Sequence, residues 1–129
     1  HVHFELFVRL EGIDDAAPAQ ADVLVHSAVK DRHGKINALS ACLMGQKVHA
    51  RDASSEGVLQ LRTQGCFVQR HVTRGDTIQI RIASNAFPLM LRNTGNPPGA
   101  HYYDGFRAAR VTVLQSPKFP SRMRFSTEP

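Results

Sequence analysis

The sequence has no tryptophan, only two cysteines, and no apolar run near the ~20 residues that a membrane-spanning helix needs. No segment of 10 residues repeats apolar positions with the spacing of a helix. Apolar residues still make up 42% of the chain and charged residues 21%, close to the average of globular proteins. We therefore expect one soluble domain over residues 1–129 with no membrane partner, and the cytoplasm is slightly favoured as its location.

The two cysteines, Cys42 and Cys66, are too few for the disulfide framework of a small secreted domain, and neither belongs to a Cys-x-x-Cys pair. We expect both to be reduced, buried thiols. The alternative is a disulfide between them. On the chain-entropy model, that cross-link would stabilise the fold by about 3 kcal/mol.

The motifs that carry catalysis or hold cofactors are also missing. A serine nucleophile elbow needs Gly-x-Ser-x-Gly, but the only glycines at that spacing, Gly95 and Gly99, have Pro97 between them. There is no phosphate-binding Gly-x-x-x-x-Gly-Lys, no Gly-x-Gly-x-x-Gly and no His-Glu-x-x-His. We expect no catalytic residue on this chain and no cofactor, which leaves open whether it is part of an enzyme.

Seven histidines raise the question of a metal. His1 and His3 would share one face of a strand, within reach of one ion, and an N-terminal histidine can chelate copper through its amine and its ring. The simpler interpretation is a set of scattered surface histidines. We favour it and predict no metal site.

The net charge of +5, from 16 basic and 11 acidic residues, raises the question of nucleic acid. Most arginines stand singly, with close pairs only at Arg107/Arg110 and Arg122/Arg124. No stripe of interleaved aromatic residues accompanies them. We expect no nucleic-acid partner.

What the sequence does contain is a period of two. In residues 2–10 and again in residues 77–83, apolar and polar side chains alternate, as in a strand with one face on a core. Shorter candidate strands are residues 23–29, 36–43, 58–62, 109–114 and 122–125. Turn residues separate them at 31–34, 54–57 and 73–76. Many short strands at this spacing predict an all-β sandwich or barrel.

Residues 85–106 interrupt the strands with a long connection rich in Pro, Asn and Gly. Connections this long inside a domain are often functional. The candidates for ligand binding or pocket lining are Asn85, Phe87, Arg92, Asn93, Tyr102 and Tyr103. The tyrosines either stack on a sugar beside Asn96 and Asp104 or pack the connection onto the sandwich, and packing is the simpler interpretation.

Four segments carry a likeness to a known family. Residues 75–88 read GDTIQIRIASNAFP, residues 91–95 read LRNTG, residues 3–11 read HFELFVRLE, and residues 111–121 run from VTV to PKFPS. In their order and spacing, these segments resemble the C-terminal domain of X-prolyl dipeptidyl peptidases, cocaine esterase and α-amino acid ester hydrolases.

This resemblance implies a jelly-roll β-sandwich of the galactose-binding-like type. It also implies an accessory role: such a domain packs on the α/β-hydrolase domain of a serine hydrolase and helps to form its substrate pocket. The catalytic triad of the family lies in the hydrolase domain, so no catalytic residue carries over to this chain. An independent module that binds a carbohydrate or a peptide is the alternative.

The chain departs from the family at its start, because family domains have further strands before the segment that matches residues 3–11. We expect either a fragment of a larger hydrolase, or an edge that another polypeptide or self-association supplies. The first strand or its neighbour would then present unpaired backbone groups. The expected partners are thus a hydrolase domain or a second copy of the chain.

Overall fold

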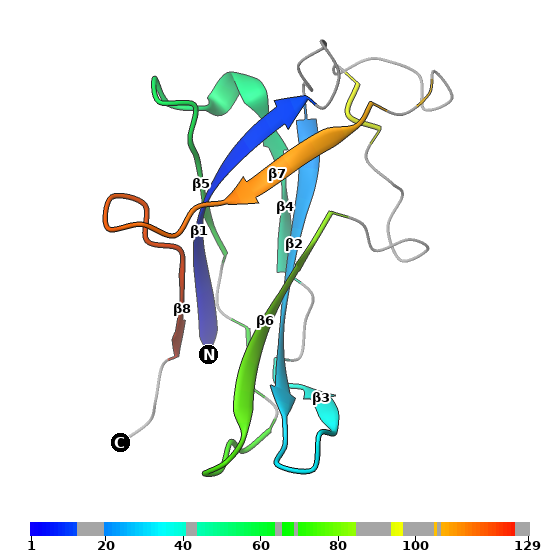
Figure 1. The fold of residues 1–129 in the computed structure, drawn as a ribbon, viewed down its shortest axis with the longest axis vertical. Helices are drawn as coiled ribbons and strands as arrows, with labels where there is room; N and C mark the ends of the chain where they lie inside the picture. The colour runs from blue at the N-terminus through cyan, green and yellow to red at the C-terminus, as the bar shows by residue number, and fades with distance from the viewer. Residues whose placement is uncertain are drawn as a thin grey trace.

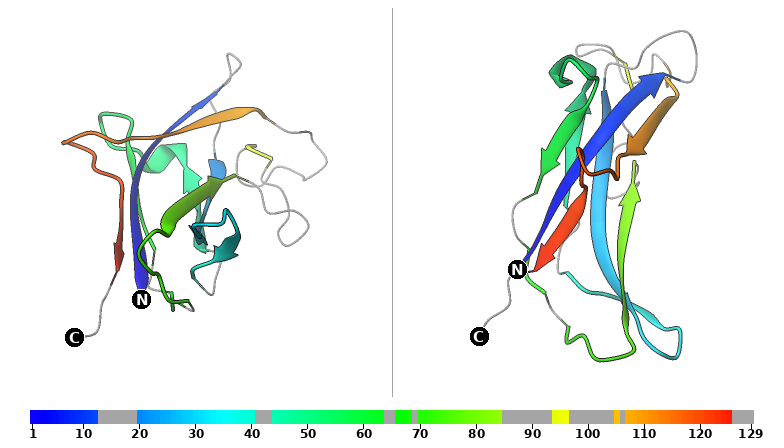
Figure 2. Two further views of the ribbon diagram at one scale, coloured as in Figure 1. Left: turned by 60° about the horizontal axis from the view of Figure 1, so that its bottom comes forward. Right: turned by 60° about the vertical axis from the view of Figure 1, so that its left-hand side comes forward.

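The computed structural model describes residues 1–12, 20–40, 44–63, 66–68, 70–84, 94–96, 105 and 107–125. These residues form two antiparallel sheets that lie face to face, as in a β-sandwich (Figure 1, Figure 2). The first sheet contains β1 (Val2–Gly12), β5 (Leu59–Arg62), β7 (Ala109–Val113) and β8 (Arg122–Phe125). The second contains β2 (Gln20–Lys30), β3 (Ile36–Ala38), β4 (Met44–His49) and β6 (Thr77–Ala83). A short 3-10 helix, Ala50–Asp52, lies between β4 and β5.

β1 is the central strand of the first sheet and is paired along both edges. On one edge it pairs with β5, from Glu5 opposite Arg62 to Val8 opposite Leu59. On the other edge, β8 pairs with the beginning of β1 and β7 with its end. The expectation of an unpaired edge is therefore wrong for the middle of this first strand, while from Arg9 to Gly12 the described residues pair it only with β7.

Ser121 connects β7 and β8 along the same edge of β1. Its Oγ accepts a hydrogen bond from the backbone N–H of Phe7 at 3.0 Å and donates one to the carbonyl oxygen of Leu114 at 2.7 Å. The N–H of Leu114 donates to the carbonyl of Phe7 at 2.7 Å. One hydroxyl thus satisfies backbone groups at the point where the chain leaves the sheet between the two strands.

β2 is the central strand of the second sheet. It pairs with β6 on one edge, from Leu24 opposite Ala83 to Lys30 opposite Thr77, and with β4 and then β3 on the other. β4 approaches β2 closely at Gly45, where a Cβ atom would collide with the side chain of Leu24. A side chain at this point of the strand would force the end of the Leu24 side chain to move.

The predicted turns at 31–34, 54–57 and 73–76 are confirmed. In the first, Asp31 Oδ1 accepts hydrogen bonds from the backbone N–H groups of His33 and Lys35, both at 2.9 Å. The bond from Lys35 is the largest cause that lowers the pKa of the Asp31 carboxyl below its usual value. In the third, Gly75 has a φ of 95°, a conformation that favours glycine.

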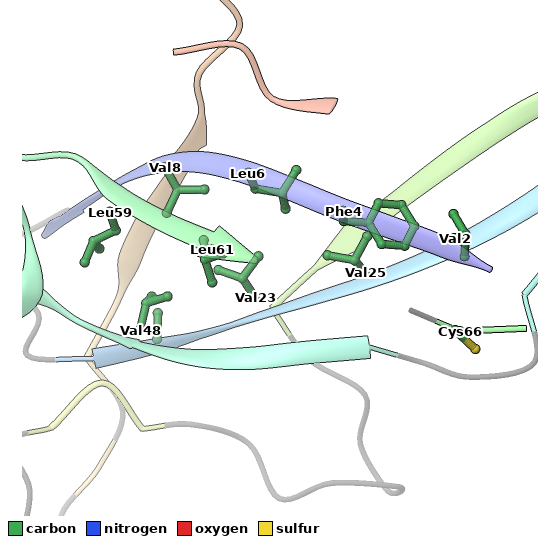
Figure 3. Packing of buried hydrophobic residues seen from close by; sticks show 11 residues of the cluster. Val2, Phe4, Leu6, Val8, Val23, Val25, Val48, Leu59, Leu61 and Cys66 are labelled. Carbon is green, nitrogen blue, oxygen red and sulfur yellow. The ribbon is translucent and has the colours of Figure 1, made fainter. Parts of the chain in front are cut away.

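The core lies between the two sheets (Figure 3). β1 contributes Val2, Phe4, Leu6 and Val8, all at most 3% exposed. Opposite them lie Val23 and Val25 of β2, with Val48 of β4, and β5 adds Leu59 and Leu61. The alternation of residues 2–10 thus predicts the buried face of β1 correctly.

Cys66 lies at the end of this core, 3% exposed, where its backbone N–H and C=O pair with those of Val2 at 3.0 and 2.8 Å. Its sulfur is in a disulfide. The prediction of a buried residue is therefore confirmed and that of a reduced thiol is wrong. Cys42, the only other cysteine of the chain, lies outside the described residues.

The strands match the predicted ranges with one substantial difference. β6 and β8 have the predicted bounds. The expected strand at 36–43 is wrong in extent, since β3 ends at Ala38 and a separate strand, β4, begins at Met44. β4 was not expected because its sequence, MGQKVH, contains a glycine and little alternation. Within the described part of the chain, no helix has the length and apolarity to cross a membrane.

Candidate functional site

The six residues proposed from the sequence as ligand-binding or pocket-lining candidates all lie outside the described residues. They are Asn85, Phe87, Arg92, Asn93, Tyr102 and Tyr103. Their role stays a prediction.

Two hydrogen bonds connect the described residues near the middle of the long connection with those at its end. The N–H of Arg107 donates to the carbonyl of Thr94 at 2.6 Å, and the side-chain amide of Asn96 donates to the carbonyl of Gly105 at 2.6 Å. Residues 94–96 are therefore hydrogen-bonded to Gly105 and Arg107. A hollow of about 140 Å³ lies beside this junction, bordered by Asp22, Ser84 and Arg107 among others. That volume is below the roughly 300–1,000 Å³ typical of ligand pockets.

A second surface is the face of β6 that carries Ile78, Ile80 and Ile82, which we call the isoleucine face. The three side chains lie opposite Val29, Ser27 and Val25 of β2, and side chains opposite one another across two strands share a face. Because Val25 belongs to the core, the isoleucine face continues the core-facing side of this sheet. Yet its side chains are 38%, 41% and 40% exposed. Within the described residues β6 pairs only with β2, so its other backbone edge is unpaired there.

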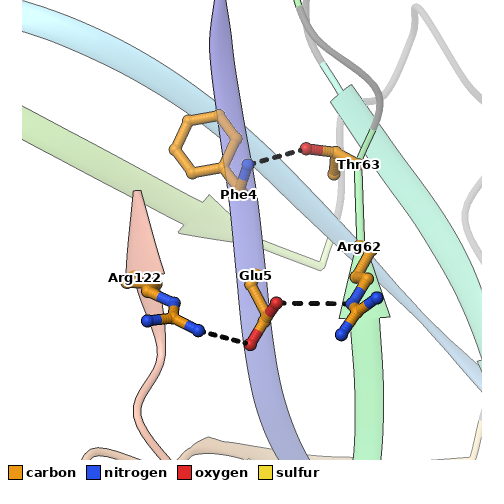
Figure 4. Close-up of polar contacts among 5 residues, drawn as sticks. All are labelled: Phe4, Glu5, Arg62, Thr63 and Arg122. Carbon is orange, nitrogen blue, oxygen red and sulfur yellow. Dashed lines mark hydrogen bonds and ion pairs between the residues drawn. The ribbon is translucent and has the colours of Figure 1, made fainter. Parts of the chain in front are cut away.

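A third surface lies on the outer face of the first sheet and contains a hollow of about 520 Å³. We call it the basic hollow. It spans β8, β1 and β5, with Glu5 between Arg62 and Arg122, and His3 opposite Arg124. Glu5 Oε2 lies 3.3 Å from Arg62 Nε, and Glu5 Oε1 lies 3.3 Å from Arg122 Nη2 (Figure 4).

Beside the basic hollow, β5 is extended by Thr63. The Oγ1 of Thr63 accepts a hydrogen bond from the N–H of Phe4 at 3.0 Å, and its own N–H donates to the carbonyl of Phe4 at 3.0 Å (Figure 4). These bonds join β5 to β1 directly beside Arg62. The base of the hollow is therefore made of three hydrogen-bonded strands.

Metal ligands do not gather in the parts of the chain that the structure describes, where no three His, Cys, Asp or Glu side chains lie close enough to hold an ion. The ring of His1 instead packs on that of Phe67, with their centroids 4.5 Å apart. His3 lies in the basic hollow.

Sequence reasoning missed the basic hollow, although one signal was present. Arg122 and Arg124 are two residues apart in a predicted strand, a spacing that places both on one face. What the pattern could not provide was the register, which brings Arg62, 60 positions away in the chain, to the other side of Glu5.

Comparisons of the chain with family models, with curated proteins and with solved structures find no match.

Proposed function

We propose that this chain is an accessory, non-catalytic β-sandwich domain of an α/β serine hydrolase of the X-prolyl peptidase or ester hydrolase type. In this proposal the sandwich is a jelly roll of the galactose-binding-like type. It packs on the hydrolase domain and helps to form the substrate pocket, while the hydrolase domain supplies the catalytic residues.

The observation that carries the proposal is the isoleucine face. Three branched apolar residues on one strand are each about two-fifths exposed, so each lacks that share of the roughly 1.5–3 kcal/mol that full burial of such a side chain provides. A face of this kind supports packing on another protein surface. The segment at 85–106 that resembles the family's loop follows β6 directly, so the apolar face and the predicted binding loop adjoin each other in the chain.

The described parts of the family-like segments support the same proposal. Residues 75–83 form the turn and strand of β6, and residues 3–11 lie in β1. The Pro-Ser pair at 120–121 closes the connection between β7 and β8, where Ser121 bonds to Phe7 and Leu114. The described parts of these segments therefore lie in the strands and turns of a sandwich, the architecture that the likeness implies.

The gene offers the most direct test. If the reading frame upstream of His1 encodes a hydrolase domain with Gly-x-Ser-x-Gly, the proposal gains its missing partner. A start codon or a signal peptide immediately before His1, or a frame that encodes an unrelated domain there, would refute it. A biochemical test runs in parallel: a fluorophosphonate should label no serine of the isolated chain, and stoichiometric labelling of one serine would place the nucleophile here instead.

The role of the isoleucine face can be tested by substitution in the full-length protein. Ile80→Asp should release the sandwich from the hydrolase domain, measured as new proteolytic cleavage between the two. Ile36→Asp is the matched control, because Ile36 is similarly exposed at 45% but lies on β3. Equal effects of the two substitutions would contradict the proposal. Concentration-dependent dimerisation of the isolated chain that Ile80→Asp abolishes would make a second copy the occupant.

A further inference from the structure

The residues that line the basic hollow include more arginines than acidic side chains. Among the described residues, Arg62, Arg122 and Arg124 stand around one carboxylate, that of Glu5, so the positive charges there exceed the negative charge by two. Within the described residues, Arg124 forms no ion pair. This excess is concentrated on adjacent positions of three paired strands, where the positive potentials of the side chains add.

Glu5 arranges the arginines rather than neutralising them all. Its side chain is only 15% exposed, whereas those of Arg62 and Arg122 are 73% and 50% exposed. Each guanidinium group uses one nitrogen for Glu5 and has further N–H donors directed elsewhere. The Gln60 amide, oriented with its oxygen toward Arg62, accepts from the same guanidinium at 3.2 Å. The two arginines are thus oriented by contacts that leave donors available.

A purely structural role accounts poorly for this arrangement. Exposed ion pairs stabilise a fold by about 0–1 kcal/mol, and one arginine would be enough to pair with Glu5. A second and a third arginine add like charges around the same carboxylate, from β5 and β8 on either side of β1, and like charges repel. The repulsion is removed when an anion occupies the space between them.

We propose that the basic hollow binds a tetrahedral oxyanion, the phosphate or sulfate group of a monoester. Guanidinium groups bind such oxygens with paired, parallel N–H donors, which gives both strength and orientation. The hollow, at about 520 Å³, is larger than one such group. Its volume lies within the roughly 300–1,000 Å³ of ligand pockets, so it leaves room for the organic part of the ester. His3 adds a further donor at the margin.

The test is a titration of the isolated chain with sodium phosphate, followed by NMR at the backbone amides of Glu5, Arg62 and Arg124. We expect saturable shifts at these amides with a Kd of about 1 mM or tighter, and none with sodium chloride at the same ionic strength. Shifts that do not saturate, or that chloride reproduces, would overturn the proposal.

A matched pair of variants distinguishes phosphate binding at the basic hollow from general attraction of phosphate to a chain of net charge +5. Arg124→Ala should weaken phosphate binding at least about tenfold. Arg81→Ala removes the same charge from the exposed Arg81 of β6 and should change the affinity less than about twofold. Arg122→Lys should also weaken binding, because lysine keeps the charge but loses the planar fork. Equal losses in Arg124→Ala and Arg81→Ala would refute a defined site.

Binding of glucose 6-phosphate and of glucose 6-sulfate distinguishes a phosphate ester from a sulfate ester as the ligand. Tighter binding of one than of the other identifies the ester, and glucose alone is the control. Competition by glucose as strong as by either ester would contradict recognition of the anion. These measurements concern the outer face of the first sheet, so their failure would leave the accessory-domain proposal untouched, and the reverse also holds.

Discussion

β1 and β6 have the same pattern in the sequence and different surroundings in the fold. In both, apolar side chains alternate with polar ones, and in both the apolar side chains point to the space between the sheets. On β1 those at 2, 4, 6 and 8 are at most 3% exposed, whereas Ile78, Ile80 and Ile82 on β6 are 38–41% exposed. The period of two therefore identifies which face is apolar, but not whether anything covers it.

The difference follows from the position of each strand in its sheet. β1 is central and has neighbours along both edges, and Val23, Val25 and Val48 of the other sheet pack over its apolar face. β6 has only β2 beside it within the described residues, and its three isoleucines are 38–41% exposed. We infer that the side chains of β1 contribute more to the stability of the isolated chain than the exposed isoleucines of β6 do.

The largest expected effect is at Phe4, which is 2% exposed in the middle of the core. Phe4→Ala should lower the free energy of unfolding by about 3–5 kcal/mol, because it removes a large side chain and leaves a cavity. Urea denaturation measures the change. Phe125→Ala is the control on the same sheet, since Phe125 is 38% exposed, and it should cost clearly less. A loss below about 1 kcal/mol for Phe4→Ala would show that β1 does not carry the core.

The next effect concerns the disulfide of Cys66, whose backbone is bonded to Val2 at the start of β1. Reduction should lower the free energy of unfolding by about 2–4 kcal/mol, since the cross-link restricts the unfolded chain. Denaturation with and without a reducing agent gives the value. In Cys66→Ala the reducing agent should have no further effect, and any effect there would mean that it acts elsewhere.

The smallest expected effect is at the isoleucine face. Ile80→Thr keeps a β-branched residue on the strand and removes an apolar group that is already 41% exposed, so the isolated chain should lose about 1 kcal/mol or less. Val8→Thr is the matched substitution on β1. It places a hydroxyl in a site that is 0% exposed and should cost about 1–3 kcal/mol or more. Equal losses of unfolding free energy at the two positions would show that β6 is as important as β1 for the stability of the isolated chain.

Much of the local structure could be predicted from the sequence, because it depends on near neighbours in the chain. The alternation at 2–10 and 77–83 predicts β1 and β6, and the turn residues at 31–34 predict the hairpin of β2 and β3. β4 could not be found this way, because Met44–His49 becomes a strand through its pairing with β2 rather than through its own pattern. The disulfide state of Cys66 likewise depends on which residues the fold brings together.

The candidate sites also differ in whether they depend on near neighbours in the chain or on the pairing of distant segments. The isoleucine face could be read from the sequence as a set of residues, although its exposure could not. The basic hollow depends on register, since Glu5 meets Arg62 on one side and Arg122 on the other only after three distant segments have paired. The loop residues chosen from the sequence, including Phe87 and Tyr102, lie outside the described residues and stay predictions.

The pairing of β1 with β8 also determines how the domain responds to mechanical force. Val2 and Phe125, near the two ends of the chain, lie opposite each other in antiparallel strands (Figure 1). The hydrogen bonds between such strands are perpendicular to them, so tension that pulls these two residues apart acts along the bonds. The pairs from Val2 to Glu5 would then open one after another, as in a zipper, rather than resisting together in shear. A sandwich tethered at these two points would yield at low force, beginning with the separation of β8 from β1.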